Sequence, residues 1–300
     1  MSKVSVVGSL NMDLVLDVSK MPKVGETITG TDLIYLVGGK GANQAVCCSR
    51  LSDDVLLIGM VGDDAFGEKI LNKMRAEGID TNHVKINENS SSGVAVITKA
   101  PEDNQIIVIP GSNSLFTSSY IEEKENLIAQ SDILISQLEI PIETVAAAMR
   151  LAKDNGIPTI LNPAPFRLLS EEFLMNVDYI TPNETEFLEM ANLKNKDISM
   201  EKAMLFWQKE HRTRLIVTLG ADGCAYVENG MVKKVPANKA MVVDTTGAGD
   251  TFNGALAHCL AQKEELGAAL AFAVKAGSLS VGKLGAQTGM PMLEEVLQAS

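Results

Sequence analysis

The sequence predicts an α/β protein in which a mostly parallel sheet is covered by helices on both faces. Short β-branched runs alternate along the chain with segments of helical periodicity, and this alternation is typical of strands joined by crossover helices. Two further segments are rich in strand-forming residues and have no helical pattern between the strands. They predict a second, smaller sheet beside the main one.

The elements of the main sheet follow from short apolar runs and from helix boundary signals. Strands are predicted at residues 4–7, 55–58, 132–136, 159–161, 179–181 and 215–218. Helices are predicted at residues 66–77, 141–155 and 170–175 and from Gly249 onward. Gly78 and Gly156 suit helix C-termini. The segment Glu228-Asn229-Gly230-Met231 favours a type I′ hairpin, so an antiparallel ribbon is expected late in the sheet.

The smaller sheet is expected to form from two insertions, at about residues 13–37 and 93–109. Its strands are predicted at residues 14–16, 27–29, 94–97 and 106–109. A separate sheet beside a large α/β domain is typical of a lid or of a subunit surface. The strand pattern does not distinguish between these two roles.

Length and composition favour one globular domain over residues 1–300, because 46% of the residues are hydrophobic. The formal charge of −12 disfavours nucleic acid and anionic membranes as partners, since binding to either needs clustered Lys and Arg. The most apolar stretch, residues 268–281, is shorter than the roughly 18 residues of a spanning helix and contains Lys275. No signal peptide is recognisable and the four cysteines lack C-x-x-C spacing, so a cytoplasmic location is expected.

The strongest functional motif is the segment 244–254, in which a strand end is followed by small residues and then by a helix. Gly247, Ala248 and Gly249 would let a ligand approach the unpaired N–H groups of the helix start, which attract a phosphoryl group. Asp250, beside them, could accept a proton from an attacking hydroxyl group. The spacing alone is equally compatible with an ordinary carboxylate stabilised by the helix dipole.

Two motifs nearer the N-terminus suggest a polar ligand such as a sugar. In the glycine-rich segment 38–45, Asn43 could bind vicinal hydroxyl groups through its amide donor and acceptor. In the segment 8–13, which follows the first strand, Asn11 and Asp13 would point into the crevice at the carboxyl ends of the strands. The first segment is also compatible with a loop that only opens a helix, and the second with a plain turn.

Two motifs in the second half suggest nucleotide and metal binding. Asn183 and Glu186, three residues apart after a strand, could hold Mg²⁺ through water. The same pair matches a capping box, and the two interpretations are compatible. The segment 218–223 places glycines after a strand, where they suit nucleotide phosphates or a tight turn.

Other patterns in the sequence argue against further sites. The segment 277–283 has the glycine and lysine spacing of a P-loop, but Leu284 replaces the required Ser or Thr and the pattern around it is helical. No G-x-G-x-x-G motif follows the first strand. The histidines His83, His211 and His258 are far apart and lack the spacing of metal ligands.

Taken together, these motifs resemble those of the ribokinase-like carbohydrate kinase family. The resemblance runs from Val4 to about Pro291, with the motifs 38–43 and 244–254 in the family's order. The segments 137–139 and 162–165 resemble the ribokinase branch in particular. The resemblance implies a three-layer α/β/α domain with a β-sheet lid that also joins two subunits as a homodimer.

The resemblance also implies roles for individual residues. A sugar would be held by Asn11, Asp13, Gly39, Lys40, Asn43 and Glu139, with Asp250 facing the attacked hydroxyl group. ATP would lie against Asn183, Thr218, Gly220, Gly223 and Val274, with its γ-phosphate near Gly249, and Glu186 would organise Mg²⁺ through water. A monovalent cation, K⁺, would bind at Asp244, Thr246, Ser280, Lys283, Gly285 and Gly289.

We therefore expect an ATP-dependent sugar kinase in which Asp250 takes the proton of the 5-hydroxyl group of ribose. Deoxyribose, fructose or a nucleoside are alternative acceptors, although the hydroxyl-binding residues favour a small furanose and only 4% of the residues are aromatic. A sugar or nucleotide sensor without catalytic activity is a further alternative. The presence of Asp250 beside the glycines argues against a sensor, because a sensor needs no base.

Overall fold

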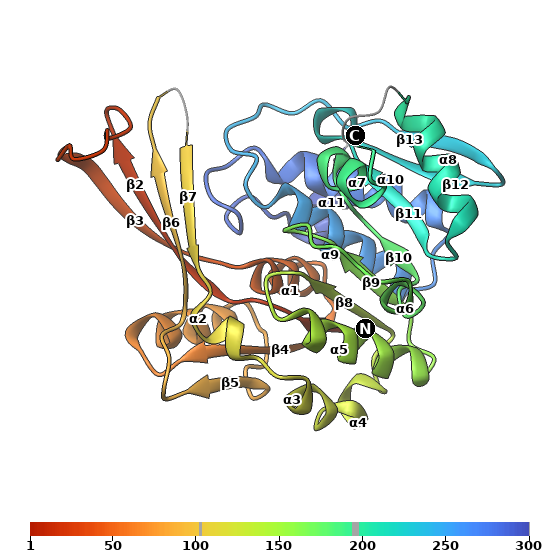
Figure 1. Cartoon of the computed structure of the whole chain (residues 1–300), viewed down its shortest axis with the longest axis horizontal. Coiled ribbons are helices and arrows are strands. Elements are labelled where there is room, and N and C mark those ends of the chain that lie inside the picture. Colours follow the sequence, from red (N-terminus) through yellow and green to blue (C-terminus); the bar gives the residue numbers. More distant parts are fainter. Residues whose placement is uncertain (102–103, 194–197, 300) are drawn as a thin grey trace.

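The computed structural model describes residues 1–101, 104–193 and 198–299, and Figure 1 shows their arrangement. Within these residues the main sheet has nine strands in the order β13-β12-β11-β10-β9-β8-β1-β4-β5. They are β1 (Lys3–Val7), β4 (Asp54–Gly62), β5 (Val84–Asn87), β8 (Ile133–Gln137), β9 (Thr159–Asn162), β10 (Tyr179–Ile180), β11 (Arg214–Thr218), β12 (Cys224–Glu228) and β13 (Met231–Val235). The pairs β11–β12 and β12–β13 are antiparallel, and all other neighbouring strands of this sheet are parallel.

Helices cover both faces of this sheet, as the sequence predicts. On one face lie α1 (Lys40–Arg50), α2 (Ala65–Ala76), α9 (Ala248–Ala261), α10 (Leu266–Ser280) and α11 (Leu293–Gln298). On the other lie α3 (Ser118–Glu122), α4 (Glu125–Ile128), α5 (Ile142–Asp154), α6 (Glu171–Leu174), α7 (Glu184–Met190) and α8 (Met200–Glu210). The short 3₁₀ helices η1 (Gly111–Leu115) and η2 (Gly220–Asp222) lie in connections.

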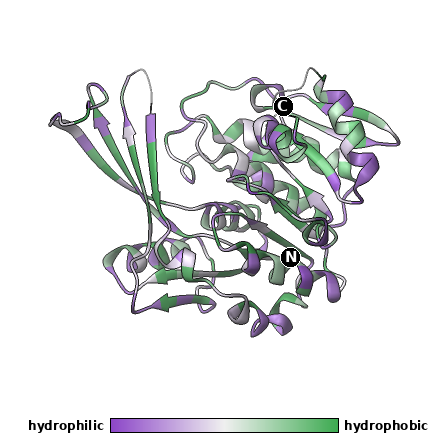
Figure 2. Ribbon diagram, in the orientation of Figure 1, coloured by the Kyte–Doolittle hydropathy of each residue, from purple (hydrophilic) through white to green (hydrophobic). Residues whose placement is uncertain are grey.

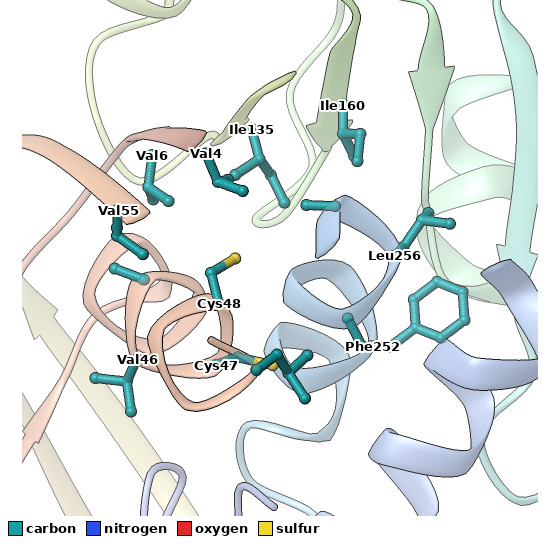
Figure 3. Close-up of a cluster of buried hydrophobic side chains, with 14 of the residues drawn as sticks. Val4, Val6, Val46, Cys47, Cys48, Val55, Ile135, Ile160, Phe252 and Leu256 are labelled. Carbon is teal, nitrogen blue, oxygen red and sulfur yellow. The ribbon is translucent and has the colours of Figure 1, made fainter. Parts of the chain in front are cut away.

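Alternate residues of the central strands fill two separate hydrophobic cores. In β8, Ile133 and Ile135 pack into one core while Leu134 packs into the other, because successive side chains of a strand point to opposite faces. Figure 3 shows the first core, where Cys47 of α1 and Phe252 of α9 lie beneath the strands. This packing holds the starts of α1 and α9 side by side.

The smaller sheet has the order β3-β2-β6-β7 and extends from the body of the molecule (Figure 1). Its strands are β2 (Asn11–Val18), β3 (Gly30–Gly38), β6 (Gly93–Lys99) and β7 (Asn104–Ile109). Figure 2 shows apolar residues along these strands, and in β7 Ile106, Ile107, Val108 and Ile109 are all at least 49% exposed.

The prediction of a strand at residues 27–29 is wrong, because the strand begins at Gly30. Val18 pairs with Gly30 across a register shift, so the ladder ends before the β-branched residues at 27–29. The turn preceding them is closed by Glu26, whose N–H donates to the Lys23 carbonyl at 2.9 Å. The geometry of the turn therefore overrides the local strand propensity of these β-branched residues.

The other local predictions agree closely with the structure. The hairpin residues Asn229 and Gly230 have φ values of 52° and 72°, as a type I′ turn requires. The P-loop-like segment at 277–283 lies mostly within α10 and not after a strand. Within the described residues, no helix combines the length and the hydropathy that a membrane crossing requires.

The order of the main sheet determines where a ligand can bind. The chain places β4 and β5 on one side of β1 and all later strands of this sheet on the other. Crevices in open α/β sheets form at the carboxyl ends of strands where the direction of winding changes. The segments that follow β1 and β8, and the starts of α1 and α9, meet at this point.

Candidate active site

Asp250 lies in the first turn of α9, at a bend that only glycine allows. Gly247 precedes the helix in the left-handed conformation, with φ of 79°. A methyl group on Gly247 would lie 2.7 Å from the Cβ atom of Ala286, so both the conformation and the packing require glycine. The bend places the Asp250 side chain in the interior, where the residue is 6% exposed.

Backbone donors surround this bend. Among the hydrogen bonds of the described residues, the N–H groups of Gly247, Gly249 and Asp250 have no acceptor. A methyl group on Gly249 would meet no atom within 4 Å, so the space in front of these donors is open. The arrangement suits a phosphoryl group. Ala248 differs from the expectation, because its N–H donates to the Thr245 carbonyl at 3.2 Å.

Both carboxylate oxygens of Asp250 accept hydrogen bonds from the start of α1. Asn43 Nδ2 donates to Oδ2 at 2.9 Å and Gln44 Nε2 donates to Oδ1 at 3.1 Å. Burial raises the pKa of Asp250, while the nearby Lys40 ammonium and the Asn43 hydrogen bond act in the opposite direction. The carboxylate is thus buried but supplied with donors, which suits a group that must accept a proton.

Asn43 retains part of its hydrogen-bonding capacity for a ligand. Its Oδ1 accepts from Gln287 Nε2 at 3.0 Å, and its Nδ2 donates to Asp250. One amide hydrogen and one lone pair remain. Asn43 can therefore still donate one hydrogen bond and accept one hydrogen bond from the hydroxyl groups of a ligand.

The other expected sugar residues gather around the same point. Glu139 Oε2 accepts from Ser9 Oγ at 2.5 Å and from the Lys40 N–H at 3.1 Å. Burial, followed by the charges of Glu139 and Asp250, raises the pKa of Asp13 to about 7. The carboxylates of Asp250 and Glu139 also lie close enough to Lys40 to raise its pKa, against the opposite and larger individual effect of burial.

Two glycines let these segments approach each other. Gly39 has φ of 88°, and a methyl group on it would lie 2.7 Å from the Asn11 nitrogen. A methyl group on Gly93 would lie 2.2 Å from Asn11 Oδ1. Asn11 is itself fixed by Asn113, whose Nδ2 donates to Asn11 Oδ1 at 2.8 Å. The small sheet and α1 therefore start directly beside Asn11.

On the expected nucleotide side, Asn183 and Glu186 form the capping box of α7. The Glu186 N–H donates to Asn183 Oδ1 and the Asn183 N–H donates to Glu186 Oε2, both at 2.9 Å. Thr218 lies beside this cap, since its N–H donates to the Pro182 carbonyl at 2.9 Å. Burial raises the pKa of Glu186, and the Asn183 hydrogen bond and the Lys40 charge partly offset this, so Glu186 lies within the electrostatic range of Lys40.

The remaining residues expected to bind the nucleotide differ in how much surface they expose to a ligand. Gly220 has φ of 55°, and a methyl group on it would meet no atom within 4 Å, so its surface is open. Gly223 has a structural reason to be glycine, because a methyl group there would lie 2.0 Å from the Val235 carbonyl oxygen. Val274 is buried in the core formed by α9 and α10 and offers little side-chain surface to a nucleotide.

The six residues expected at a cation site lie in the loop before α9 and in the end of α10 with the loop that follows it. Asp244 Oδ1 accepts from the N–H and hydroxyl of Thr246 at 2.9 and 2.7 Å, and Oδ2 accepts from the Gly285 N–H at 2.8 Å. Although burial acts in the opposite direction, these bonds lower the pKa of Asp244. A methyl group on Gly289 would lie 1.9 Å from the Ser280 carbonyl oxygen, so these two positions touch. Lys283 is exposed.

The structure also reveals polar residues to which the sequence assigned no role. They are Gln44, Gln137, Asn162 and Gln287, all buried near Asp250, and Ser9 and Asn113, which hold Glu139 and Asn11. Gln44 follows Asn43 directly, and Gln137 and Asn162 end their strands. Polar residues at strand ends were a usable signal. For Gln287 the sequence offered none, since it lies in an irregular loop.

Comparison with known proteins shows relatives over nearly the whole chain. The pattern of the pfkB family carbohydrate kinases matches residues 1–293. A Lactococcus lactis protein named ribokinase is 44% identical over 297 residues, which cover 99% of this chain and 96% of that protein. A Bacillus subtilis protein of the same name is 40% identical over 296 residues, covering 99% and 98%.

Solved structures agree as well. The structure of Arabidopsis thaliana ribokinase complexed with ribose and ATP matches with a TM-score of 0.92 and 30% identity, and each chain is covered completely. The ribokinase of Thermotoga maritima matches with a TM-score of 0.89 and 34% identity, covering 99% of this chain and 98% of the other. Because the family pattern and these relatives extend over nearly the whole length, the chain belongs to the pfkB family of carbohydrate kinases.

Proposed function

We propose that this protein transfers the γ-phosphate of ATP to the 5-hydroxyl group of ribose, with Asp250 as the general base. One observation carries the proposal: the Asp250 carboxylate lies between hydroxyl-binding side chains and the unpaired N–H groups at the start of α9. The relatives named ribokinase, and the relative complexed with ribose and ATP, support ribose as the acceptor.

In the proposed reaction, Asp250 accepts the proton of the 5-hydroxyl group while its oxygen forms a bond to the γ-phosphorus. The bond from the γ-phosphorus to the bridging oxygen breaks, and ADP leaves with that electron pair. The N–H groups of Gly247, Gly249 and Asp250 stabilise the charge on the transferring group. The proton-accepting carboxylate and the charge-stabilising donors belong to one helix turn, so they act at one point.

Sugar binding is assigned to the cluster that surrounds Asp250. Asn11, Asp13, Asn43 and Glu139 would bind the remaining hydroxyl groups, and the backbone at Gly39 and Lys40 would complete the site. With a pKa raised to about 7, Asp13 is partly protonated near neutral pH and can donate as well as accept. This mixture of donors and acceptors suits a molecule with several hydroxyl groups.

The nucleotide and Mg²⁺ are assigned to the side of the cleft formed by α7, β11 and η2. Glu186 fits Mg²⁺ held through water, because the capping box engages only Oε2 and leaves Oε1 without a hydrogen bond among the described residues. Bound there, Mg²⁺ would neutralise phosphate charge. Asn183, Thr218, Gly220 and Gly223 would line the phosphates. The structure gives no separate support for Val274 as an adenine contact.

A monovalent cation such as K⁺ is assigned to the two loops around Asp244. The available donors are oxygens, namely a carboxylate and the backbone carbonyls near Thr246, Ser280, Lys283, Gly285 and Gly289, and hard cations prefer oxygen ligands. Bound there, the cation would add positive charge beside the phosphoryl site. The hydrogen bond from Gly285 to Asp244 holds the two loops together without it.

The small sheet is assigned two further roles, as a lid over the sugar and as the contact between two subunits. Its inner end carries Asn11 and Asp13, so its movement would open or close the sugar site. Its edge strand β7 is apolar and exposed, which favours burial against a second copy. A cytoplasmic location remains a prediction from the sequence.

A product assay tests the proposed function. The protein is incubated with ATP, Mg²⁺, K⁺ and one of ribose, deoxyribose, fructose or a nucleoside, and the products are identified by phosphorus and carbon NMR. We expect ribose 5-phosphate as the main product. Faster turnover of another acceptor would replace ribose in the proposal. Sugar or nucleotide binding without any phosphorylated product would favour a sensor.

A further inference from the structure

Asp250 receives its hydrogen bonds from amides that are themselves oriented by other amides. Gln287 Nε2 donates to Asn43 Oδ1 at 3.0 Å, and Asn43 Nδ2 donates to Asp250 Oδ2 at 2.9 Å. We call Gln287 and Asn43 the first amide pair. They come from the loop after α10 and from α1, which are separated by 244 residues in sequence.

A second amide pair approaches the other oxygen in the same way. Gln137 Nε2 donates to Gln44 Oε1 at 2.6 Å, and Gln44 Nε2 donates to Asp250 Oδ1 at 3.1 Å. Gln44 Nε2 also lies 3.4 Å from Asn162 Oδ1. Each oxygen of the carboxylate therefore ends a chain of two amides, and in both chains each amide nitrogen donates one hydrogen bond in the direction of Asp250.

Both chains end in an unsatisfied carbonyl. Among the described residues, the buried side-chain polar atoms that lack any partner are Gln137 Oε1 and Gln287 Oε1. These are the far ends of the two amide pairs. A buried carbonyl without a donor costs free energy, so a reason is needed for two such atoms at matching positions.

The charge of Asp250 supplies that reason. An ionised carboxylate only accepts hydrogen bonds, so Asn43 and Gln44 must turn their N–H groups towards it. Their carbonyls then face outward and require donors, which Gln287 and Gln137 provide. Reversing either outer amide would place its carbonyl oxygen against the carbonyl oxygen of Gln44 or Asn43. One buried negative charge thus fixes the orientation of four amides.

We propose that the two amide pairs are built to keep Asp250 ionised in its buried position, with Gln137 and Gln287 as positioning residues that act through Gln44 and Asn43. The proposal rests on the proposed function of Asp250 as a base, because a base must be ionised before it accepts a proton. Aligned amide dipoles strengthen one another in a medium of low polarity, and here both chains present their positive ends to the carboxylate.

Other influences on Asp250 act in opposite directions, and their net effect raises its pKa, so the amide hydrogen bonds oppose a real tendency towards the neutral acid. Burial and the Glu139 carboxylate favour the neutral acid, whereas Lys40 favours the carboxylate. Asp13 and the buried thiol of Cys47 also lie within the electrostatic range of Asp250. After the proton has been transferred, the amides no longer match the neutral acid, which favours loss of the proton before the next turnover.

The outer glutamines are held by rigid neighbours. Arg50 Nη1 donates to the backbone carbonyl oxygens of Gln287 at 2.6 Å and of Met290 at 2.9 Å. Arg50 also forms a 2.8 Å ion pair with Glu77, in which both side chains are largely buried. Gln137 is the last residue of β8 in the centre of the sheet. Such support is expected of residues that orient a catalytic group.

The decisive measurement is the pKa of Asp250 itself. Protein labelled with ¹³Cγ-aspartate is titrated by NMR, and the Asp250 signal is identified by its absence from Asp250→Asn. We expect Gln287→Met and Gln137→Met each to raise this pKa by about half a pH unit, and Gln44→Met, which removes a direct donor, by about one unit. Methionine keeps the volume and removes the donor. The measurement needs no turnover, so it is independent of the sugar assay.

Gln208→Met is the matched control. Gln208 donates to the His211 and Thr213 carbonyls at 3.0 Å, far from Asp250 in the sequence and on the opposite face of the sheet. We expect it to lower the melting temperature and leave the pKa of Asp250 unchanged. The acid limb of kcat should move to higher pH in the Gln287 and Gln137 variants, with little change in KM for the sugar.

A merely structural role predicts a different result. In that case the outer variants would lower the melting temperature as Gln208→Met does, and the pKa of Asp250 would stay at its original value. That outcome overturns the proposal. The two outer glutamines come from separate elements, β8 and the loop after α10, so if one outer variant does not fold, the result at the other position decides.

Discussion

Replacement of Asp250 by asparagine tests the central assignment with the smallest change of shape. The variant removes the charge and one of the two acceptor oxygens. Two donors, Asn43 Nδ2 and Gln44 Nε2, point at the carboxylate, so one of them would face the new amide group without an acceptor. One unsatisfied buried donor costs about 1–3 kcal/mol. Removal of the buried charge offsets part of this loss, and we expect a net destabilisation of at most about 2 kcal/mol.

The effect on the reaction should be much larger than the effect on folding. Removal of a general base lowers kcat by about 10²–10⁴, which corresponds to about 2.7–5.4 kcal/mol in activation free energy. The KM for the sugar should change little, because Asn11, Asp13 and Glu139 are unaltered. Initial rates of ADP release measure kcat and KM, and thermal unfolding measures the stability of the same preparation.

Asp53→Asn is the matched control for this experiment. The Asp53 side chain is 1% exposed and accepts from His258 Nδ1 at 3.0 Å, and His258 lies about two turns beyond Asp250 on α9. This variant makes the same chemical change against the same helix, so it should lose stability and keep kcat. Turnover of Asp250→Asn near the native rate would refute the general-base role. An equal loss of kcat in both variants would show that damage to α9, and not loss of the base, was the cause.

Three further predictions follow from the geometry. Gly249→Ala should fold with native stability or with a stability higher by about 0.4–1 kcal/mol, because its methyl group meets no protein atom within 4 Å. The kcat should nevertheless fall about tenfold or more, because the methyl group would occupy the space of the phosphoryl group. Native initial rates would show that the phosphate does not use this space. Ile107 lies in the edge strand β7 and is 64% exposed, so Ile107→Asp should convert a dimer into a monomer, as measured by light scattering. A monomeric native protein would remove the dimer proposal. The pKa of Asp13 is raised from 3.8 to about 7, so the unfolded chain loses this proton near pH 4 while the folded protein keeps it up to about pH 7. The stabilisation is therefore complete below about pH 4 and is lost as the pH rises to about 7. In urea unfolding, Asp13→Asn should flatten this fall of stability by up to about 1.4 kcal/mol per pH unit, and parallel pH profiles of the two proteins would contradict the shift.

The fold was predictable where local signals and burial agree. The strands that became β1, β4 and β8 are short apolar runs, and strands buried on both faces need such runs. The hairpin at Asn229 and Gly230 needs positive φ values, which this residue pair supplies readily. The segment 27–29 failed because its strand propensity was local, whereas the ladder was set by the partner strand β2.

The candidate site was predictable in part for a related reason. Glycines at 39 and 247 mark close approaches of the backbone, and such approaches can be recognised without knowing what is approached. Gln287 could not be recognised, because nothing near it in the sequence indicates that its amide meets Asn43 across 244 residues. The protonation of Asp13 and Asp250 was equally inaccessible, since it depends on burial and on charges contributed by other segments.

The sequence by itself determined the order of strands and helices, the two glycine bends and the carboxylate at the second bend, because each depends on residues within one turn or one strand. Only the tertiary structure decided which amides face that carboxylate, which carbonyls remain unsatisfied and how far each carboxyl group is shifted in pKa. Hydrogen bonds and electrostatic interactions depend on distance in space, and the sheet order brings together residues that the chain keeps far apart.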